Sequence, residues 1–312
     1  MGLGNQMFQY AAALALSLEK KTALKVDVSS YEGYKLRKYE LEEYFNIKTP
    51  NATAEEIVSF RFDNPVKKVW NKLVPSKKIK MLGLPYEEAG LPRTALALYD
   101  TISSPHKRKT YQECHYHFDQ NFFNANKEVY LQGYWMSWKY FHKYDQQVRE
   151  AFTIEKDLVN HLSNFVNEIQ SSNSVSIHIR RTDYKTDPLM KKLKGEIPVA
   201  YYQKAVTRIC DQYKDVKLYF FSDDIEWVKQ NLSFTELPVH YIDKTITSSA
   251  IEDFYLMAQC KHNIISNSTF SWWAAFLNAN ENNMVIAPKK WYSDASHYNY
   301  KDVYPQDWII VE

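Results

Sequence analysis

The carboxyl-terminal half of the chain alternates short apolar runs with longer amphipathic stretches. Five runs rich in β-branched and aromatic residues predict strands, and the stretches between them have helical periodicity. The expected strands cover residues 175–179, 217–221, 238–242, 262–265 and 283–287, and the expected helices cover 199–213, 224–231, 249–259 and 270–279. Strands that alternate with helices at this spacing form a parallel sheet through right-handed crossovers. The pattern therefore predicts an α/β fold with a parallel sheet in this half.

Polar residues follow each of these strands. Two adjacent arginines come after the first strand, and the later strands end in acidic, amide or hydroxyl side chains. Ligands of parallel α/β sheets bind beyond the carboxyl ends of the strands. We therefore expect one pocket at this edge, formed by His178, Arg180, Arg181, Asp183, Ser222, Asp223, Asp224, Asn267, Ser268, Thr269 and Ser271.

Placing Arg180 and Arg181 at the end of a strand costs free energy unless each cation finds an anion or water. One interpretation is a clamp for a phosphorylated ligand, since forked guanidinium groups match phosphate oxygens. The alternative is a pair of surface arginines that neighbouring carboxylates satisfy. Their position at the polar edge of the sheet favours the clamp.

Two further groups at this edge have competing interpretations. The hydroxyl-rich loop 266–269 opens a helix, so it is either an anion cradle or an ordinary N-cap. Its hydroxyls exceed what one cap needs, which favours binding. Asp223 and Asp224 suit a divalent metal that bridges a diphosphate, or a ribose or base, and Asp224 alternatively caps the helix that follows. The arginines already supply the charge that a metal would bring, so we expect no metal.

The amino-terminal half begins with a glycine loop that runs into a helix expected over 11–19, followed by a strand over 22–28. Gly2 and Gly4 suggest a dinucleotide fold. Met7 opposes it, because it stands where the third glycine should be, and no strand precedes Gly2. A glycine loop that opens a helix still presents backbone N–H groups to a ligand. Asn5 and Gln6 add side-chain groups there, or simply cap the helix.

Three other segments have open interpretations. Residues 66–82 carry six lysines and no acid, so they either dock on an anionic membrane or form a solvated helix face. The cluster 114–117 contains a cysteine and two histidines, but a third ligand in register is lacking, and we expect no metal. The aromatic stretch 129–142 suits the core better than a sugar platform.

Composition narrows the class of protein. The chain has 312 residues, is 45% hydrophobic and 24% charged, and has a net charge of +2, which does not suggest nucleic-acid binding. Three widely spaced cysteines fit a reducing compartment. Neither a transmembrane run nor a signal peptide is apparent, so we expect a cytoplasmic protein. A polar stretch around 152–172, with a helix expected over 156–169, places a domain boundary near 160.

Taken together, these blocks resemble the bacterial α-1,2-fucosyltransferases, which are inverting enzymes of GT-B type that use GDP-fucose. The likeness spans nearly the whole chain. The matching stretches are Gly2-Leu3-Gly4-Asn5-Gln6-Met7-Phe8-Gln9-Tyr10, His178-Ile179-Arg180-Arg181-Thr182-Asp183-Tyr184, Phe221-Ser222-Asp223-Asp224 and Ser266-Asn267-Ser268-Thr269-Phe270-Ser271-Trp272-Trp273.

The resemblance implies two Rossmann-like domains, with an acceptor domain over 1–160 and a GDP-fucose domain over 161–312 whose tail packs back on the first. It places Arg180 on the donor diphosphate, and His178 and Asp183 near the nucleotide. The Ser222-Asp223-Asp224 block would serve the nucleoside and the 266–271 loop the diphosphate. Asn5 would reach toward the transferred sugar, and no metal ion would take part.

The implied activity is that of a galactoside 2-α-L-fucosyltransferase in cell-surface polysaccharide synthesis. Its expected partners are GDP-fucose and a galactose-terminated, lipid-linked acceptor, with peripheral membrane contact through 66–82. Other members of the family carry a strand and one more glycine before Gly2. We therefore expect either that the true start lies upstream or that the acceptor domain lacks its first strand. Transfer of another GDP-linked sugar, or binding without turnover, are the alternatives.

Overall fold

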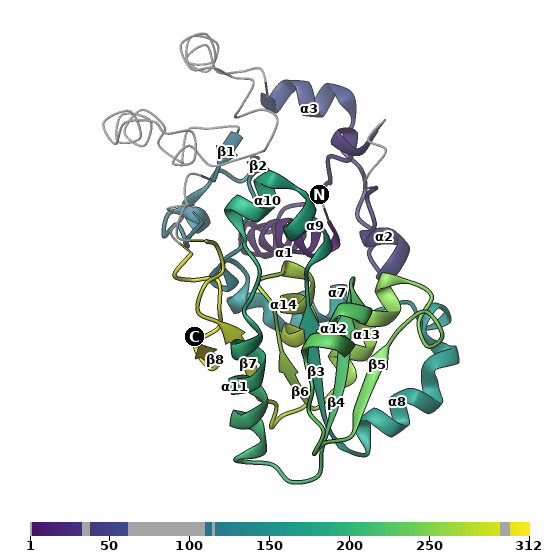
Figure 1. The fold of residues 1–312 in the computed structure, drawn as a ribbon. Helices are drawn as coiled ribbons and strands as arrows, with labels where there is room; N and C mark the ends of the chain where they lie inside the picture. The colour runs from purple at the N-terminus through teal and green to yellow at the C-terminus, as the bar shows by residue number, and fades with distance from the viewer. Residues whose placement is uncertain (1, 33–37, 62–109, 114–115, 294–299) are drawn as a thin grey trace. The chain divides into compact units, whose positions relative to one another are not determined.

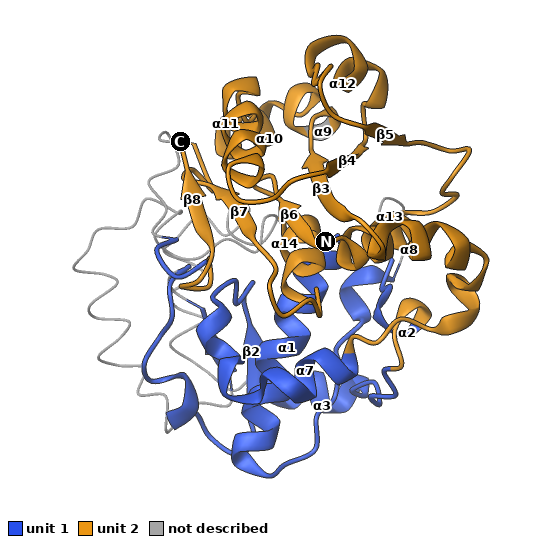
Figure 2. Ribbon diagram, turned by 90° about the horizontal axis from the view of Figure 1, so that it is seen from below, with its two compact units in different colours: residues 1–42, 47–151, 297–303 blue, residues 43–46, 152–296, 304–312 orange. Residues whose placement is uncertain are grey.

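The computed structural model describes residues 2–32, 38–61, 110–113, 116–293 and 300–312. The chain divides into two compact units, shown in Figure 2. Unit 1 comprises residues 1–42, 47–151 and 297–303, and unit 2 comprises residues 43–46, 152–296 and 304–312. The main change of unit therefore comes between Ala151 and Phe152. The boundary predicted from the sequence lies near residue 160. The lysine-rich segment 66–82, Cys114 and His115 lie outside the described residues.

Unit 2 is built on a six-stranded parallel sheet (Figure 1). Its strand order is β5-β4-β3-β6-β7-β8. The strands are β3 (Asn173–Ile179), β4 (Val216–Ser222), β5 (Val239–Ile242), β6 (His262–Ile264), β7 (Val285–Pro288) and β8 (Ile309–Val311). The five strands predicted from the pattern are confirmed, and their parallel pairing with them. Strand β8 was not predicted, because its three residues carry too little pattern to distinguish them from a loop.

Helices cover both faces of this sheet. One face packs on α11 (Val199–Cys210) and α12 (Ile225–Asn231), and the other on α8 (Ser163–Gln170), α13 (Ala250–Gln259) and α14 (Thr269–Phe276). Two short helices, α9 (Thr182–Thr186) and α10 (Pro188–Leu193), lie between β3 and α11 and were not predicted. The single helix expected over 156–169 is instead two 3₁₀ turns, η7 (Lys156–Leu158) and η8 (Asn160–Leu162), followed by α8.

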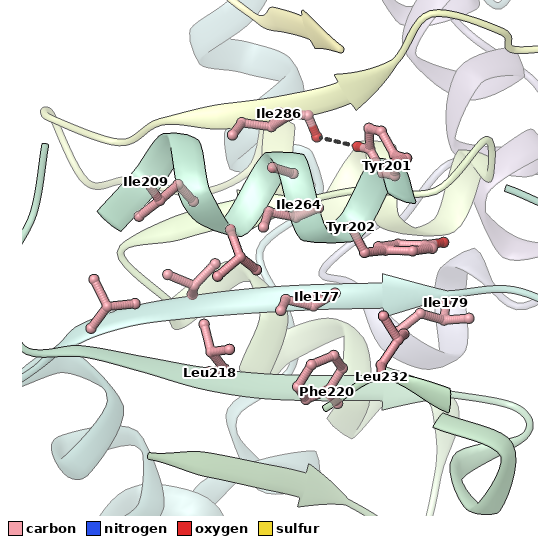
Figure 3. Packing of buried hydrophobic residues seen from close by; sticks show 14 of the residues in the cluster. Ile177, Ile179, Tyr201, Tyr202, Ile209, Leu218, Phe220, Leu232, Ile264 and Ile286 are labelled. Atoms are coloured by element: carbon pink, nitrogen blue, oxygen red, sulfur yellow. Dashed lines mark hydrogen bonds between the residues drawn. The ribbon is translucent and has the colours of Figure 1, made fainter. Parts of the chain in front are cut away.

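The core under α11 explains why these elements form where they do. Val175, Ile177 and Ile179 alternate along β3 and point to the α11 face, where they pack with side chains of β4, β6 and α11 (Figure 3). Tyr201 anchors the start of α11 to β6 and β7, because its hydroxyl donates to the carbonyl oxygens of Ile265 at 2.8 Å and Ile286 at 3.0 Å. These hydrogen bonds hold the α10–α11 junction at the carboxyl edge of the sheet.

Unit 1 contains α1 (Leu3–Lys20), α3 (Ala54–Arg61), α7 (Asp145–Ala151) and a parallel pair of short strands, β1 (Thr110–Gln112) and β2 (Tyr130–Gln132). Helix α2 (Leu41–Tyr44) spans the change of unit. The short 3₁₀ turns are η1 (Ser29–Tyr31), η4 (Phe122–Asn124), η5 (Trp138–Tyr140) and η6 (His142–Tyr144). The strand predicted over 22–28 is wrong: only Val26 pairs, with Asn51. Pro50 in the partner segment lacks the N–H that a longer ladder would need.

The aromatic stretch 129–142 lies in the core of unit 1, as expected. Trp135, Tyr140 and Phe141 are buried, and Tyr140 packs edge-on against Trp135 and Phe122. Across the described ranges, no helix is both long and apolar enough to span a bilayer.

Candidate functional site

The strand order reverses between β3 and β6, and open α/β sheets bind ligands in a crevice at the carboxyl edge of such a reversal. From β3 the chain proceeds to β4 and β5 in one direction, and then crosses back to add β6 on the other side of β3. Loops that leave β3 and β6 therefore diverge to opposite faces, and this reversal is where open α/β sheets bind ligands. The predicted residues His178, Arg180, Asn267 and Ser268 lie at these two strand ends. The structure thus brings together the two blocks that the sequence singled out most strongly.

The side chain of Arg181 is bound by other described residues of the protein. Its guanidinium donates to Glu196 at 3.0 Å and to Asp224 at 3.3 Å, and its Cζ lies 3.5 Å from the centre of the Trp227 ring. Only 7% of the side chain is exposed. This is the arrangement of the structural alternative, in which neighbouring carboxylates satisfy the arginine. The geometry therefore gives Arg181 a role in fastening β3 to β4 and α12.

Arg180 differs from its neighbour although the two are adjacent. Its Nη1 lies 3.3 Å from an Asp223 carboxylate oxygen, and 28% of the side chain is exposed. Side chains of a strand alternate, so Arg180 continues the face of His178 and Arg181 continues the face of Ile179. Of the two arginines, Arg180 is therefore the one that presents a forked donor to a ligand at the crevice.

Asp223 and Asp224 are engaged in local structure. Asp223 accepts from the backbone N–H groups of Arg181 at 2.9 Å and Thr182 at 3.0 Å, which caps α9. Asp224 caps α12 by accepting from the N–H of Trp227 at 3.3 Å, and Ser222 Oγ accepts from the N–H of Asp224 at 3.0 Å. The cap that was one of the sequence alternatives is present for Asp224, and the cap made by Asp223 was not predicted.

His178 is a buried, neutral imidazole at the mouth of the crevice. Its Nδ1 lies 2.9 Å from Ser266 Oγ, and its ring packs against Phe270 of α14. Burial, together with the smaller effect of the positive charge of Arg180, lowers the pKa of His178 to about 3. The imidazole therefore links β3 to β6 as a hydrogen-bonding group and does not act as a cation.

The hydroxyl-rich loop uses most of its hydroxyls internally. Ser268 caps α14 by accepting from the N–H of Phe270 at 3.4 Å, and Ser271 Oγ donates to the Ser268 carbonyl at 3.3 Å. Ser266 is paired with His178 as described, and Thr269 begins α14. The hydroxyls that seemed to exceed the needs of one cap thus fix the shape of the loop.

Asn267 contains an unpaired acceptor in the middle of this loop. The side chain is fully buried, and its Nδ2 donates to the carbonyl oxygen of Lys194 at 3.1 Å. Its Oδ1 has no hydrogen-bond partner among the described residues. The hydroxyl of Tyr184 donates to the Asn267 carbonyl at 3.1 Å, which ties the loop to α9. A buried carbonyl oxygen without a donor is costly in a folded protein. The part of Asn267 that acts on the site is therefore its Nδ2, which holds the backbone at Lys194.

Sequence reasoning missed several residues of this region. Lys194, Tyr184, Glu196 and Trp227 all contact predicted site residues. Tyr184 lies in the short helix α9, Lys194 and Glu196 lie in the segment between α10 and α11, and Trp227 lies in α12. Tyr184 belonged to a recognised block, and its adjacency to that block was the one available signal. Asp183 lies in α9, and its side chain is not among those that the structure describes.

The predicted amino-terminal site residues lie in unit 1, and their arrangement differs from a loop. Helix α1 already begins at Leu3 with Gly2 as its N-cap, so Gly4, Asn5 and Gln6 form its first turn. The glycine loop expected at 2–6 is therefore wrong. Gln6 is 2% exposed, and its amide donates to the Lys38 carbonyl and accepts from the Glu40 N–H, each at 2.9 Å. It anchors the 38–40 segment to α1.

Chemically, the crevice of unit 2 can bind a phosphorylated ligand. It combines the partly exposed guanidinium of Arg180, the first N–H groups of α14 and a neutral imidazole at one strand-order reversal. These groups stabilise negative charge that is fixed on a phosphate or that develops during its departure.

Comparison with known proteins agrees with this geometry. Residues 78–312 match the family described as glycosyl transferase family 11. The O-antigen biosynthesis glycosyltransferase WbnK of Escherichia coli is 32% identical over 307 residues, which are 94% of this chain and 93% of that protein. The α-1,2-colitosyltransferase of Escherichia coli is 29% identical, covering 100% of this chain and 96% of that protein.

Two further similarities concern part of the chain and the fold. The mouse galactoside α-(1,2)-fucosyltransferase 2 is 30% identical over 155 residues, which are 48% of this chain and 44% of that protein. The crystal structure of the fucosyltransferase NodZ from Bradyrhizobium superposes with a TM-score of 0.51 at 15% identity, covering 88% of each chain. The latter confirms the expected GT-B-like α/β fold. The resemblance inferred from the sequence blocks is confirmed as well: the chain is a glycosyltransferase that belongs to glycosyl transferase family 11.

Proposed function

We propose that this chain transfers L-fucose from GDP-fucose to the 2-hydroxyl of a galactose-containing acceptor, with inversion, in the synthesis of a cell-surface polysaccharide. The observation that carries the proposal is the place of Arg180 at the strand-order reversal between β3 and β6, in a chain of family 11. The relatives support the linkage and the setting, because they are named for O-antigen biosynthesis and for α-1,2 transfer.

The reaction is a single displacement at the anomeric carbon. The acceptor oxygen forms a bond to C1 of fucose while the bond from C1 to the β-phosphate oxygen breaks, and the acceptor hydroxyl gives up its proton. Negative charge therefore grows on the departing GDP. Arg180 and the first N–H groups of α14, beside Ser268 and Thr269, stabilise that charge where it develops.

The other predicted roles form part of the same proposal. His178 and Asp183 lie toward the nucleotide, and the Ser222, Asp223 and Asp224 block lies toward the nucleoside. In the structure these aspartates hold the backbone of α9 and α12, so they would act mainly by keeping the loop after β4 in shape. Asn5 is proposed to reach the transferred sugar.

The proposed reaction requires no metal ion, since Arg180 supplies the positive charge at the diphosphate. Turnover is therefore expected to be the same with and without EDTA when no metal is added. Loss of activity in EDTA, restored by a divalent cation, would contradict this part of the proposal.

The central experiment measures transfer to a galactoside from GDP-fucose beside GDP-mannose, with the linkage of the product determined by NMR. We expect an α-1,2-linked fucose from GDP-fucose and no transfer of mannose. Arg180→Ala is the matched inactive control, because it removes the guanidinium group and leaves the capped loops intact. Binding of GDP-fucose without hydrolysis or transfer would instead indicate a nucleotide-sugar-binding protein.

A second donor deserves the same assay because of one observation. The α-1,2-colitosyltransferase aligns over the whole of this chain. Colitose is the 3-deoxy analogue of L-fucose, so the two donors share the reacting carbon and the leaving group. Faster transfer from GDP-colitose than from GDP-fucose would assign the chain to that donor.

The proposed acceptor is a galactose-terminated glycan on a lipid, reached from the cytoplasmic face of a membrane. Residues 66–82 are proposed as the membrane contact because of their six lysines. Flotation with anionic liposomes and not with neutral liposomes would support the contact, and equal recovery with both would remove it.

A further inference from the structure

The amine of Lys194 has no anionic partner in the part of the chain that the structure describes. Lys194 follows α10, and its side chain lies against the loop that leaves β7. Its Nζ is 4.3 Å from the centre of the Trp291 ring and 4.0 Å from the centre of the Tyr292 ring. Within the described ranges no carboxylate pairs with it. Aromatic faces attract a cation, yet they leave its N–H donors unused.

The backbone of Lys194 is fixed to the site by Asn267. The Asn267 amide donates to the carbonyl oxygens of Lys194 at 3.1 Å and Gly195 at 3.5 Å. Gly195 has a φ of +67°, a conformation that favours glycine and turns the chain sharply after Lys194. The chain is also tied from β7, because the N–H of Ser293 donates to the Leu193 carbonyl at 2.8 Å. This segment is therefore held at the carboxyl ends of β6 and β7.

The N–H donors of the Lys194 amine have no hydrogen-bond acceptor among the described residues, and its recorded contacts are the two aromatic rings. Burial lowers the pKa of this amine well below its usual range, because no anion of the described residues offsets the loss of water. Unpaired groups of this kind are rare unless a ligand completes them.

We propose that Lys194 is a second cation for the diphosphate of the nucleotide-sugar donor, on the β7 side of the crevice. Its ammonium donates to phosphate oxygens, while the Asn267 amide holds its backbone in place. Trp291 and Tyr292 hold the amine in place before the ligand arrives. This inference rests on the proposed function, because it takes the donor to be a nucleoside diphosphate sugar.

The site complements Arg180 across the sheet. Arg180 ends β3, Asn267 follows β6 and Trp291 follows β7, and these three strands are neighbours in the order β3-β6-β7. A diphosphate bound at the reversal would thus meet one cation from each side. A diphosphate carries more negative charge than one arginine offsets, and Arg181 is already paired with Glu196 and Asp224.

The test is calorimetric titration of the whole chain with GDP and with guanosine. Lys194→Met keeps the length and the apolar contacts of the stem and removes the charge. We expect it to weaken GDP binding about tenfold to a hundredfold and to leave guanosine binding unchanged. The matched control is Lys191→Met, an exposed lysine of α10, which should bind GDP as the wild type does. Lys194→Gln serves in its place if the Met variant does not fold.

The thermal midpoint separates this role from a structural one. Removing an unpaired, partly buried cation should leave the melting temperature of Lys194→Met equal to or above that of the wild type. Wild-type affinity for GDP in this variant, or an equal loss for guanosine, would overturn the inference. A wild type that does not bind GDP would instead refute the proposed donor, so the two failures are distinguishable.

Discussion

The neutral state of His178 makes a testable contribution to stability. The imidazole is 6% exposed, its Nδ1 lies 2.9 Å from Ser266 Oγ, and its pKa falls from 6.5 to about 3. Burial is the main cause, and Arg180 adds to it. In the unfolded chain the same group protonates near its ordinary value of about 6.5. Acid therefore protonates the unfolded chain first.

The sign and the size of the effect follow from proton linkage. Because the folded pKa lies below the unfolded one, the contribution of His178 is fully present above about pH 6.5 and is lost as the pH falls toward 3. The free energy of unfolding should decrease by about 1.4 kcal/mol per pH unit over that interval. The full difference is about 5 kcal/mol, of which about 3 kcal/mol is lost by about pH 4.5.

The test uses the substitution His178→Asn. Asparagine keeps an amide atom near the Nδ1 position and has no group that titrates. Urea unfolding of both proteins is measured from about pH 7.5 to about pH 4.5, which brackets the unfolded pKa. We expect the free energy of unfolding of the variant, relative to that of the wild type, to increase by about 3 kcal/mol as the pH falls. Other acid-sensitive groups are common to both proteins and cancel in the difference.

Ser176→Ala is the matched control from the same strand. It removes the hydroxyl that accepts from Asn263 Nδ2 at 2.7 Å, and neither serine nor alanine titrates. Its stability gap to the wild type should therefore not change with pH. A gap for His178→Asn that is equally independent of pH would refute the reasoning, since it would mean that the folded and unfolded imidazoles bind protons alike.

Two further predictions concern charge at other positions. Arg180→Ala and Arg180→Lys should each lower turnover about a hundredfold to a thousandfold in steady-state assays, because the fork stabilises charge on the leaving diphosphate, and near wild-type rates in both would exclude that role. Burial raises the pKa of Asp253, which accepts from Thr247 Oγ1 at 2.6 Å, to about 6. Its folded pKa lies above the unfolded one, so ionisation weakens the fold as the pH rises, and Asp253→Asn should gain up to about 3 kcal/mol above pH 7. That gain should vanish below about pH 4 in urea unfolding, and a gain that persists there would contradict the assignment.

The sheet was predictable because its signal is local. Each strand is a short apolar run between helical stretches, and the parallel topology then places every strand end at one edge. His178 and Asn267 could be assigned to that edge without any knowledge of tertiary contacts. Strand β8 and the helices α9 and α10 were missed for the opposite reason, since their few residues carry no repeating pattern.

The different roles of Arg180 and Arg181 depend on contacts that sequence does not show. Alternation along β3 could have placed them on opposite faces. The partners that occupy Arg181 are Glu196 and Trp227, which lie fifteen and more residues away in the chain and are brought close only by α11 and α12. Two identical neighbours therefore have different roles, and only the tertiary structure shows which of them faces the crevice.

The same distinction moves the centre of the proposed site. Asp223, Asp224, Ser268 and Ser271 were predicted as ligand contacts, and each is engaged in a cap or a turn. These side chains are already hydrogen-bonded in the free protein, so they need not reorganise when negative charge develops on a ligand nearby. Their contribution is to hold backbone N–H groups in place. The Lys194 amine, in contrast, has no hydrogen-bond or ion-pair partner among the described residues. Ligand binding energy should therefore concentrate between Arg180 after β3 and the loop after β7.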